Sequence, residues 1–192
     1  MKEDFIKVFQ FKITLDDTNP PVWRRVQVPE NYTFWDLHVA IQDSMGWMDS
    51  HLHEFIVKDP STGGEMSFGI PDEEFDDIFA KFLPGWEYHI SDYFSIKNKR
   101  ARYIYDFGDN WEHTVILEKV LIREKGTNYP VCIAGERACP PEDCGSLPGY
   151  EDLCAGKHQF QKEYKAEGFD PDKFDPKEVV FDDPGERLKR WE

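Results

Sequence analysis

Hydrophobic and polar residues alternate at the start of the chain. Large apolar side chains recur at every second position over residues 8–15, and a second alternating run covers residues 22–28. The residues between the two runs, Asp-Asp-Thr-Asn-Pro-Pro, have the composition of a turn. The pattern therefore predicts two half-buried strands that pair as an antiparallel hairpin.

The period changes to that of a helix after the hairpin. Apolar side chains fall on one helical face over residues 34–45. Thr33 and Asp36 have the spacing of an N-terminal capping box, and Gly46 follows the last apolar position, where helices commonly end. His38 lies off the apolar face, so we expect it on the helix surface. One helix should therefore pack on the opening hairpin.

Alternation returns in the middle of the chain and predicts four more strands and one acidic helix. A turn at residues 106–110 separates the last two strands, which should form a second hairpin. His51 and His53 fall on one side of the first of these strands. Two such imidazoles can share a metal ion, although a polar strand edge is the favoured interpretation. The predicted strands cover residues 52–57, 65–70, 100–105 and 111–122, and the helix covers residues 72–82.

The last part of the chain is less regular. Residues 129–133 add a short strand and lead into a cysteine-rich loop, where two consecutive prolines at 140–141 prevent regular pairing. Two short helices are predicted at residues 148–155 and 158–166. Apolar residues recur in the turn-rich tail that follows, so we expect the tail to dock on the rest of the protein.

Together these elements predict one α+β domain that opens with hairpin, helix and strand. The chain of 192 residues is long enough for one sizeable core. It contains no internal repeat and no low-complexity linker. We therefore expect one domain over residues 1–192, with its core at about residues 8–174 and the C-terminal tail docked on it.

The chain is strongly acidic, with a formal net charge of −15 from 38 acidic and 23 basic residues. Phosphate recognition requires concentrated Lys and Arg, so this composition argues against a nucleic-acid or anionic-membrane surface. The sequence has no apolar run of transmembrane length and no signal-peptide hydrophobic region after Met1. We therefore expect a cytoplasmic protein, whose 4 cysteines stay reduced or bind metal.

Three cysteines and one histidine form the first candidate site. Cys132, Cys139 and Cys144 have the spacing C-x6-C-x4-C, and His113 lies on a predicted strand that could run beside them. Three thiolates and one imidazole suit tetrahedral zinc, which would brace an irregular loop. The spacing is wider than the C-x2-C of zinc ribbons, so cysteines that only pack as small apolar residues are the alternative.

Acidic residues near the same loop form the second candidate site. If they met in one cleft, they would bind a hard cation or act as general acid and base. The alternative is structural, because carboxylates at these positions can also cap the turns in which they lie. The candidate catalytic residues are Asp106, Asp109, His113, Glu142 and Asp143.

Large aromatic side chains support a third hypothesis, a binding module. In an open groove such rings hold a peptide or a small aromatic or sugar-like ligand, and neighbouring arginines supply an anion-binding rim. The alternative is that most of the rings belong to the core. The candidate ligand-binding residues are Trp23, Arg24, Arg25 and Trp111.

Five segments carry a family resemblance: PVWRR at 21–25, TFWDLH at 33–38, HEF at 53–55, YDFGDNWEH at 105–113 and GERACPPEDCG at 135–145. In this order they resemble the plasmid pRiA4b ORF-3-like family, over about residues 8–174. The resemblance implies an α+β fold, a single-domain α/β roll with an antiparallel or mixed sheet, and says little about activity. Some members carry the name of a transposon resolvase. That name does not fit this acidic chain, which has no serine before Ser44 to act as an N-terminal recombinase nucleophile.

The sequence thus predicts a protein that binds a protein or small-molecule partner. An enzyme would require catalytic side chains that converge within about 3–5 Å of one point in an open cleft, whereas a binding module would require an aromatic groove elsewhere. The alternative function is a metal-assisted or acid/base hydrolase-like enzyme, with zinc as its candidate cofactor, that uses Asp106, Asp109, His113 and Glu142.

Overall fold

The computed structural model describes residues 5–71 and 82–191. Within them, eight strands form one sheet. The strands are β1 Lys7–Leu15, β2 Val22–Pro29, β3 His53–Lys58, β4 Glu65–Gly69, β5 Leu83–Pro84, β6 Arg100–Tyr105, β7 Trp111–Ile122 and β8 Val131–Glu136. The helices are α1 Phe34–Met45, α2 Ile90–Tyr93, α3 Ser146–Cys154, α4 Gln161–Ala166, α5 Pro184–Leu188 and the 3-10 turn η1 Pro176–Glu178.

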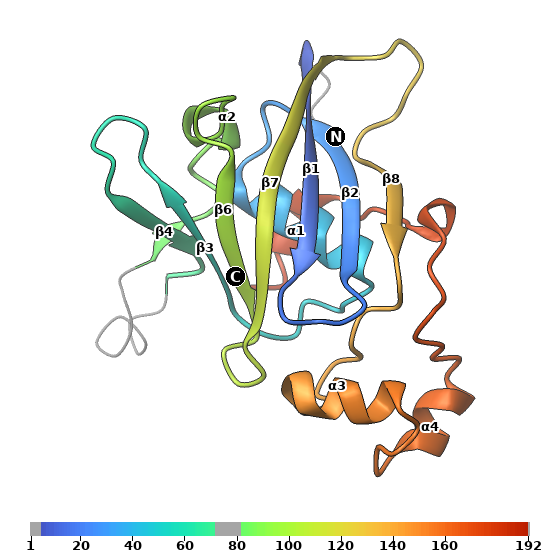
Figure 1. The fold of residues 1–192 in the computed structure, drawn as a ribbon. Coiled ribbons are helices and arrows are strands. Elements are labelled where there is room, and N and C mark those ends of the chain that lie inside the picture. The colour runs from blue at the N-terminus through green and yellow to red at the C-terminus, as the bar shows by residue number, and fades with distance from the viewer. Residues whose placement is uncertain (1–4, 72–81, 192) are drawn as a thin grey trace.

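The sheet has the strand order β5-β4-β3-β6-β7-β1-β2-β8, and helix α1 lies across one of its faces (Figure 1). Strands β4 and β5 are parallel, and every other neighbouring pair is antiparallel. The predicted α+β class with a mixed sheet is therefore confirmed. The predicted helix at residues 72–82 falls, apart from Phe82, outside the described residues.

Both predicted hairpins are confirmed. Strand β1 pairs with β2, and β6 pairs with β7 across the 106–110 turn. In β1 the alternating residues Phe11 and Ile13 are fully buried beneath α1. On the opposite face, Gln10 donates a hydrogen bond to Glu118 at 2.8 Å, so that face carries a polar network. Strand β1 thus has one buried face and one polar face, as the alternating sequence predicted.

Helix α1 begins and ends at the predicted residues. The Thr33 hydroxyl accepts from the Asp36 amide and the Asp36 carboxylate accepts from the Thr33 amide at 2.7 Å, a complete capping box. Gly46 ends the helix in the left-handed region at φ 94°. The surface position predicted for His38 is wrong, because this side chain is 0% exposed. His38 packs against the sheet, where its ring stacks on His53 of β3 and contacts the Tyr103 hydroxyl of β6.

The C-terminal tail covers a different part of α1. The indole of Trp35 donates to the Pro184 carbonyl at 2.8 Å, and Arg187 pairs with Asp43 at 2.6 Å. Figure 1 shows the red C-terminal segment passing beside α1. Contacts between the tail and the domain thus extend well beyond residue 174.

The tail also docks on β8. Gly135 in that strand leaves the space in which the Phe174 ring lies, because a β-carbon at this position would overlap the ring. The Arg24 guanidinium also lies over the Phe174 ring, 3.6 Å from its centroid.

Within the described residues, no helix combines the length and apolar character needed to cross a membrane.

We expect loss of the capping box to destabilise the protein measurably. Thr33→Ala removes the hydroxyl that accepts from the Asp36 amide, which should lower the free energy of unfolding by about 1 kcal/mol. Thr33→Ser keeps a hydroxyl and should retain most of the stability. Urea denaturation of both variants checks this, and equal midpoints for the two would contradict it.

Candidate metal centre

The end of β6 places the first carboxylate of the candidate site. Asp106 has a left-handed backbone, φ 56°, and its amide donates to the Leu52 carbonyl at 2.9 Å. One carboxylate oxygen, Oδ1, accepts from the Gly108 amide at 2.9 Å. The turn therefore binds Oδ1 of Asp106, and the second carboxylate oxygen, Oδ2, remains available to residues outside the turn.

The proline-rich loop after β8 supplies the second and third carboxylates. Glu142 Oε1 accepts from the Tyr105 hydroxyl at 2.9 Å and from the Met48 amide at 2.9 Å. These two bonds fix the Glu142 side chain and leave Oε2 buried with no hydrogen-bond partner. Asp143 follows with φ 54°, and its side chain is 77% exposed.

His51 stands at the centre of these carboxylates. Its Nε2 atom lies 3.7 Å from Asp106 Oδ2, 3.8 Å from Glu142 Oε2 and 3.3 Å from Asp143 Oδ1. Nε2 is buried and makes no hydrogen bond. We call these four residues, from three separate segments of the chain, the His51 site.

The electrostatics around the site keep the Tyr105 hydroxyl protonated. Burial, followed by the negative charge of Glu142, raises the pKa of Tyr105 far above its usual range. The hydroxyl consequently acts as a hydrogen-bond donor to Glu142 and as an acceptor from the Ser50 amide at 3.0 Å. Tyr105 thus positions Glu142 and links it to the segment that carries His51.

The donor set of the His51 site matches what a divalent ion requires. Ligand atoms of His51, Asp106 and Asp143 lie within 4.8 Å of one another, close enough to share one ion. One imidazole nitrogen with carboxylate oxygens is a set used by first-row transition metals, whereas calcium and magnesium prefer oxygen ligands alone. The exposed Asp143 leaves one side of the site facing solvent.

The structure brings together three of the five predicted catalytic residues. Asp106, Glu142 and Asp143 converge on His51, which the sequence analysis considered only as a partner of His53. Asp109 instead lies within hydrogen-bond distance, 3.3 Å, of the Gly145 amide at the start of α3. The sequence signal for His51 is its place in the His-Leu-His segment next to a strand, and only the fold shows which acids face it.

His113 lies elsewhere, inside the core. It is 0% exposed, and its Nδ1 faces the Tyr103 carbonyl at 3.3 Å. Burial lowers the pKa of His113 to about 4, so the imidazole is neutral at pH 7. A neutral core histidine packed edge-on against Trp47 has a structural role in this fold.

The cysteine and histidine set predicted for zinc is not brought together. All four cysteines are free thiols, and among the described residues no three of His113, Cys132, Cys139 and Cys144 form a group with ligand atoms within 4.8 Å. Burial raises the pKa of Cys144 to about 12 and the pKa of Cys139 further still. Buried thiols that are not grouped with His113 match the packing alternative.

The predicted aromatic and arginine site is divided: the Arg25 guanidinium lies 5.0 Å from the centroid of the Trp23 ring, whereas Arg24 and Trp111 are buried elsewhere. Arg24 is 1% exposed, and its guanidinium donates to the carbonyl oxygens of Ser44 and Glu136 at 2.8 and 3.0 Å. Arg25, on the other face of the sheet, binds the Glu118 carboxylate through two nitrogens at 2.6 and 2.8 Å.

The two tryptophans of that hypothesis are separated as well. Trp23 donates its indole hydrogen to Glu136 at 3.1 Å, on the polar face of the sheet. Trp111 is 2% exposed and belongs to the core. These placements do not form a common groove.

A second group of titratable residues lies buried behind the His51 site. His38 Nε2 contacts Asp49 at 2.8 Å and Nδ1 contacts the Tyr103 hydroxyl at 2.9 Å, so both ring nitrogens have partners. The His38 and His53 rings stack 3.5 Å apart at 9°. One ligand atom from each of His38, Asp49 and His53 lies within 4.8 Å of the others, but all three residues are buried and the His38 nitrogens are already paired. This group therefore fits a packed polar network better than a metal site.

A family model described as Plasmid pRiA4b ORF-3-like protein matches residues 7–178. The chain belongs to this family. It is 38% identical over 149 residues to the uncharacterised protein y4hQ of Sinorhizobium fredii, a match that covers 77% of this chain and 71% of the relative.

A crystal structure of a protein of unknown function, MM3350, from Methanosarcina mazei Go1 has the same fold. It superposes with a TM-score of 0.84 at 44% identity and covers 94% of this chain and 100% of that chain. The relatives found are thus proteins without an assigned activity. All four residues of the His51 site lie inside the segment that matches the pRiA4b ORF-3-like family.

We expect Arg24 and Arg25 to differ sharply in their importance for stability. Arg24→Met leaves buried carbonyl oxygens without a donor and should lower the free energy of unfolding by about 3 kcal/mol. Arg25→Met removes a partly exposed ion pair, with side chains 27% and 24% exposed, and should cost about 1 kcal/mol or less. Chemical denaturation of the two variants checks this, and similar losses would show that Arg24 is not a structural centre.

His113 should make the stability of the protein depend on acid. Above about pH 6.5, the pKa of histidine in the unfolded chain, His113 is neutral in both the folded and the unfolded state. Its protonation then does not lower the free energy of unfolding. As the pH falls from about 6.5 towards 4, the unfolded chain binds a proton that folded His113 excludes, which should remove roughly 3 kcal/mol. Urea unfolding at pH 7 and pH 4 measures this loss.

The variant His113→Asn should reduce that pH-dependent loss, whatever its effect on stability at pH 7. The control His89→Asn alters an exposed histidine and should leave the difference between the two pH values unchanged. If both variants retain the full difference, His113 is not the titrating group.

Proposed function

We propose that the protein binds one divalent first-row transition-metal ion at the His51 site. The observation that carries this proposal is the pair of buried, unpartnered atoms that face each other there, His51 Nε2 and Glu142 Oε2. A buried polar atom without a partner is costly, and a bound ion would satisfy both at once.

An ion pair with protonated His51 is the competing explanation of the same geometry. Three carboxylates would then share one imidazolium, at distances of 3.3 to 3.8 Å that exceed those of good charge-assisted hydrogen bonds. Two of these carboxylates are largely buried, with Asp106 and Glu142 side chains 9% and 12% exposed. One monovalent cation leaves net negative charge in this partly desolvated site, whereas a divalent ion offsets more of it.

A metal-assisted hydrolase is the second candidate function. The feature that favours it is the exposure of Asp143, which leaves room for a water molecule on the solvent side of the site. A divalent ion lowers the pKa of a bound water, and a nearby carboxylate can accept its proton. In this version Asp106, Glu142 and Asp143 act with His51, while Asp109 and His113 have structural roles.

The remaining expectations concern surroundings and partners. We expect the protein in the cytoplasm, where its four thiols would stay reduced. Its formal net charge of −15 suits recruitment of cations and opposes binding to nucleic acid. We propose a metal ion as the primary ligand and a protein or small molecule as a further partner.

Titration of purified, chelator-treated protein with Zn²⁺ and Mn²⁺ tests the proposal. Calorimetry at pH 7 should give one site per chain, and affinity should fall in acid because protons compete for the ligand atoms. His51→Ala should weaken binding at least about 100-fold, since loss of an outer partner alone costs 10–100-fold. His89→Ala, an exposed histidine outside the site, is the matched control and should bind as the unaltered protein does.

A further variant separates a built site from casual binding to acidic residues. Tyr105→Phe removes only the hydroxyl that holds Glu142, and it should weaken the metal about tenfold. Binding that His51→Ala and Tyr105→Phe both leave intact would place the metal elsewhere. No saturable binding of either metal would overturn the proposal.

A further inference from the structure

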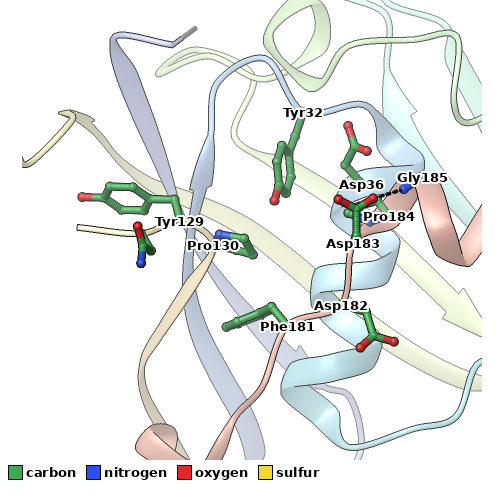
Figure 2. A pocket seen from close by; sticks show the side chains of 10 residues that line it. Tyr32, Asp36, Tyr129, Pro130, Phe181, Asp182, Asp183, Pro184 and Gly185 are labelled. Carbon is green, nitrogen blue, oxygen red and sulfur yellow. Dashed lines mark hydrogen bonds between the residues drawn. The ribbon is translucent and has the colours of Figure 1, made fainter. Parts of the chain in front are cut away.

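A cavity of about 710 Å³ lies between helix α1, the segment before β8 and the C-terminal tail (Figure 2). Two of its carboxylates are engaged in caps. Asp36 accepts from the Thr33 amide at 2.7 Å, and Asp183 accepts from the Gly185 amide at 2.9 Å. This cavity therefore belongs to the contact by which the tail docks on the domain.

A second hollow, of different character, lies over β3, β6 and β7 on the face of the sheet that α1 does not cover. Ala101, Tyr103 and Tyr105 of β6 are buried in the core, so the alternate side chains of Arg100 and Arg102 point to the opposite face. Figure 1 shows this face towards the viewer, with α1 behind the sheet. The volume of the hollow is about 500 Å³, and small-molecule sites commonly occupy about 300–1,000 Å³.

Basic side chains dominate the lining, and we call this site the basic hollow. It is lined by five basic and two acidic residues, in a chain whose formal net charge is −15. The five basic residues are all exposed to solvent. They are Lys58, Lys97, Lys99, Arg100 and Arg102, and the acidic residues are Asp16 and Glu65.

The positive charges of the basic hollow are only partly offset. Within residues 5–71 and 82–191, none of the five basic residues forms a salt bridge. The Thr114 hydroxyl separates the nearest acid from Arg100, because it accepts from Arg100 at 3.0 Å and donates to Asp16 at 3.1 Å. Burial raises the pKa of Asp16 and of Glu54, and the charges of Arg100 and Arg102 oppose this rise only in part.

A tight turn at residues 95–98 fixes the backbone beside the strands. Its first and last residues exchange backbone hydrogen bonds at 3.0 and 3.1 Å. The side-chain amide of Asn98 donates to the Lys58 carbonyl of β3 at 2.7 Å, and the Leu117 amide of β7 donates to the Lys99 carbonyl at 2.8 Å. The lysines of the basic hollow therefore extend from a backbone that is tied to two strands.

The local charges decide what this hollow attracts. At about 0.1 M salt the screening length is about 10 Å, so acidic groups farther away contribute little to the field inside it. Guanidinium and ammonium groups bind phosphate oxygens through charge-assisted hydrogen bonds. The described lining contains no aromatic ring on which a nucleic-acid base would stack, so recognition there would rest on phosphate charge.

We propose that the basic hollow binds a compact anion with two or more linked phosphate groups, either inorganic or as the phosphate chain of a nucleotide. The basic groups come from the end of β3, from β6 and from the turn before β6, so linked phosphates reach more of them than a single phosphate does. The site shares no residue with the His51 site. It lies at the start of β6, whereas Asp106 follows the end of that strand, so the inference goes beyond the proposed metal binding.

Titration with phosphates of increasing charge tests the proposal. Calorimetry of the chelator-treated full chain at pH 7 should show saturable binding of tripolyphosphate and at least about tenfold weaker binding of orthophosphate. The affinity for tripolyphosphate should fall as salt is added, because the contacts are exposed to solvent. No saturable binding of tripolyphosphate, or equal affinity for the two anions, would overturn the proposal.

Two further probes identify the source of the phosphates. ATP that binds more tightly than tripolyphosphate would assign the hollow to nucleotides, and equal affinity would assign it to the phosphate chain alone. A short oligothymidylate, whose phosphates are spread along a strand, should bind more weakly than tripolyphosphate. Tighter binding of the oligonucleotide would contradict a site for a compact anion.

Variants locate the binding. Lys99→Gln and Arg102→Gln each remove one exposed charge and should each weaken tripolyphosphate about threefold, and the double variant about tenfold. Lys125→Gln is the matched control, since it removes an exposed charge outside the hollow and should bind as the unaltered protein does. Full affinity in the double variant would refute this location.

The same titrations separate this proposal from the metal site. His51→Ala should leave tripolyphosphate binding unchanged, whereas the double variant should leave Zn²⁺ binding unchanged. Loss of tripolyphosphate binding in His51→Ala would contradict an independent basic hollow. Circular dichroism of each variant confirms that it is folded before titration.

Discussion

The fold depends on one buried arginine. Arg24 carries a positive charge into the interior, where burial lowers its pKa but leaves it charged at neutral pH. Its guanidinium joins the Ser44 carbonyl at the end of α1, the Glu136 carbonyl of β8 and the Phe174 ring of the tail. A buried charge is tolerated only when its donors are satisfied, so these segments must meet around it.

The arrangement around Arg24 has a direct effect on the His51 site. It fixes the end of β8, and the proline-rich loop that follows carries Glu142 and Asp143 to His51. It also fixes the tail at Phe174, beside Gly135 of β8.

The His51 site illustrates how a protein holds acidic groups together. Asp106 and Glu142 each have one carboxylate oxygen held by a hydrogen bond, from the Gly108 amide and the Tyr105 hydroxyl respectively. Asp143 is positioned by its left-handed backbone conformation. Their mutual repulsion is thus opposed by local bonds before any ligand arrives. Preorganised groups of this kind reduce the reorganisation that binding requires.

The sequence by itself determined the hairpins, the limits of α1 and the family, because alternation, capping residues and turn composition are local properties. It could not determine the burial of His38, since periodicity shows which helix face is apolar and not which polar partners, here Tyr103, Asp49 and the stacked His53, a polar side chain meets in the fold. It named Asp106, Glu142 and Asp143 as candidates, but Arg24 and His113 lie in the core, and the described cysteines do not gather around His113. Only the tertiary structure brought two distant segments, at Asp106 and at Glu142–Asp143, to His51, because side-chain convergence depends on strand order and loop direction, which no local pattern encodes.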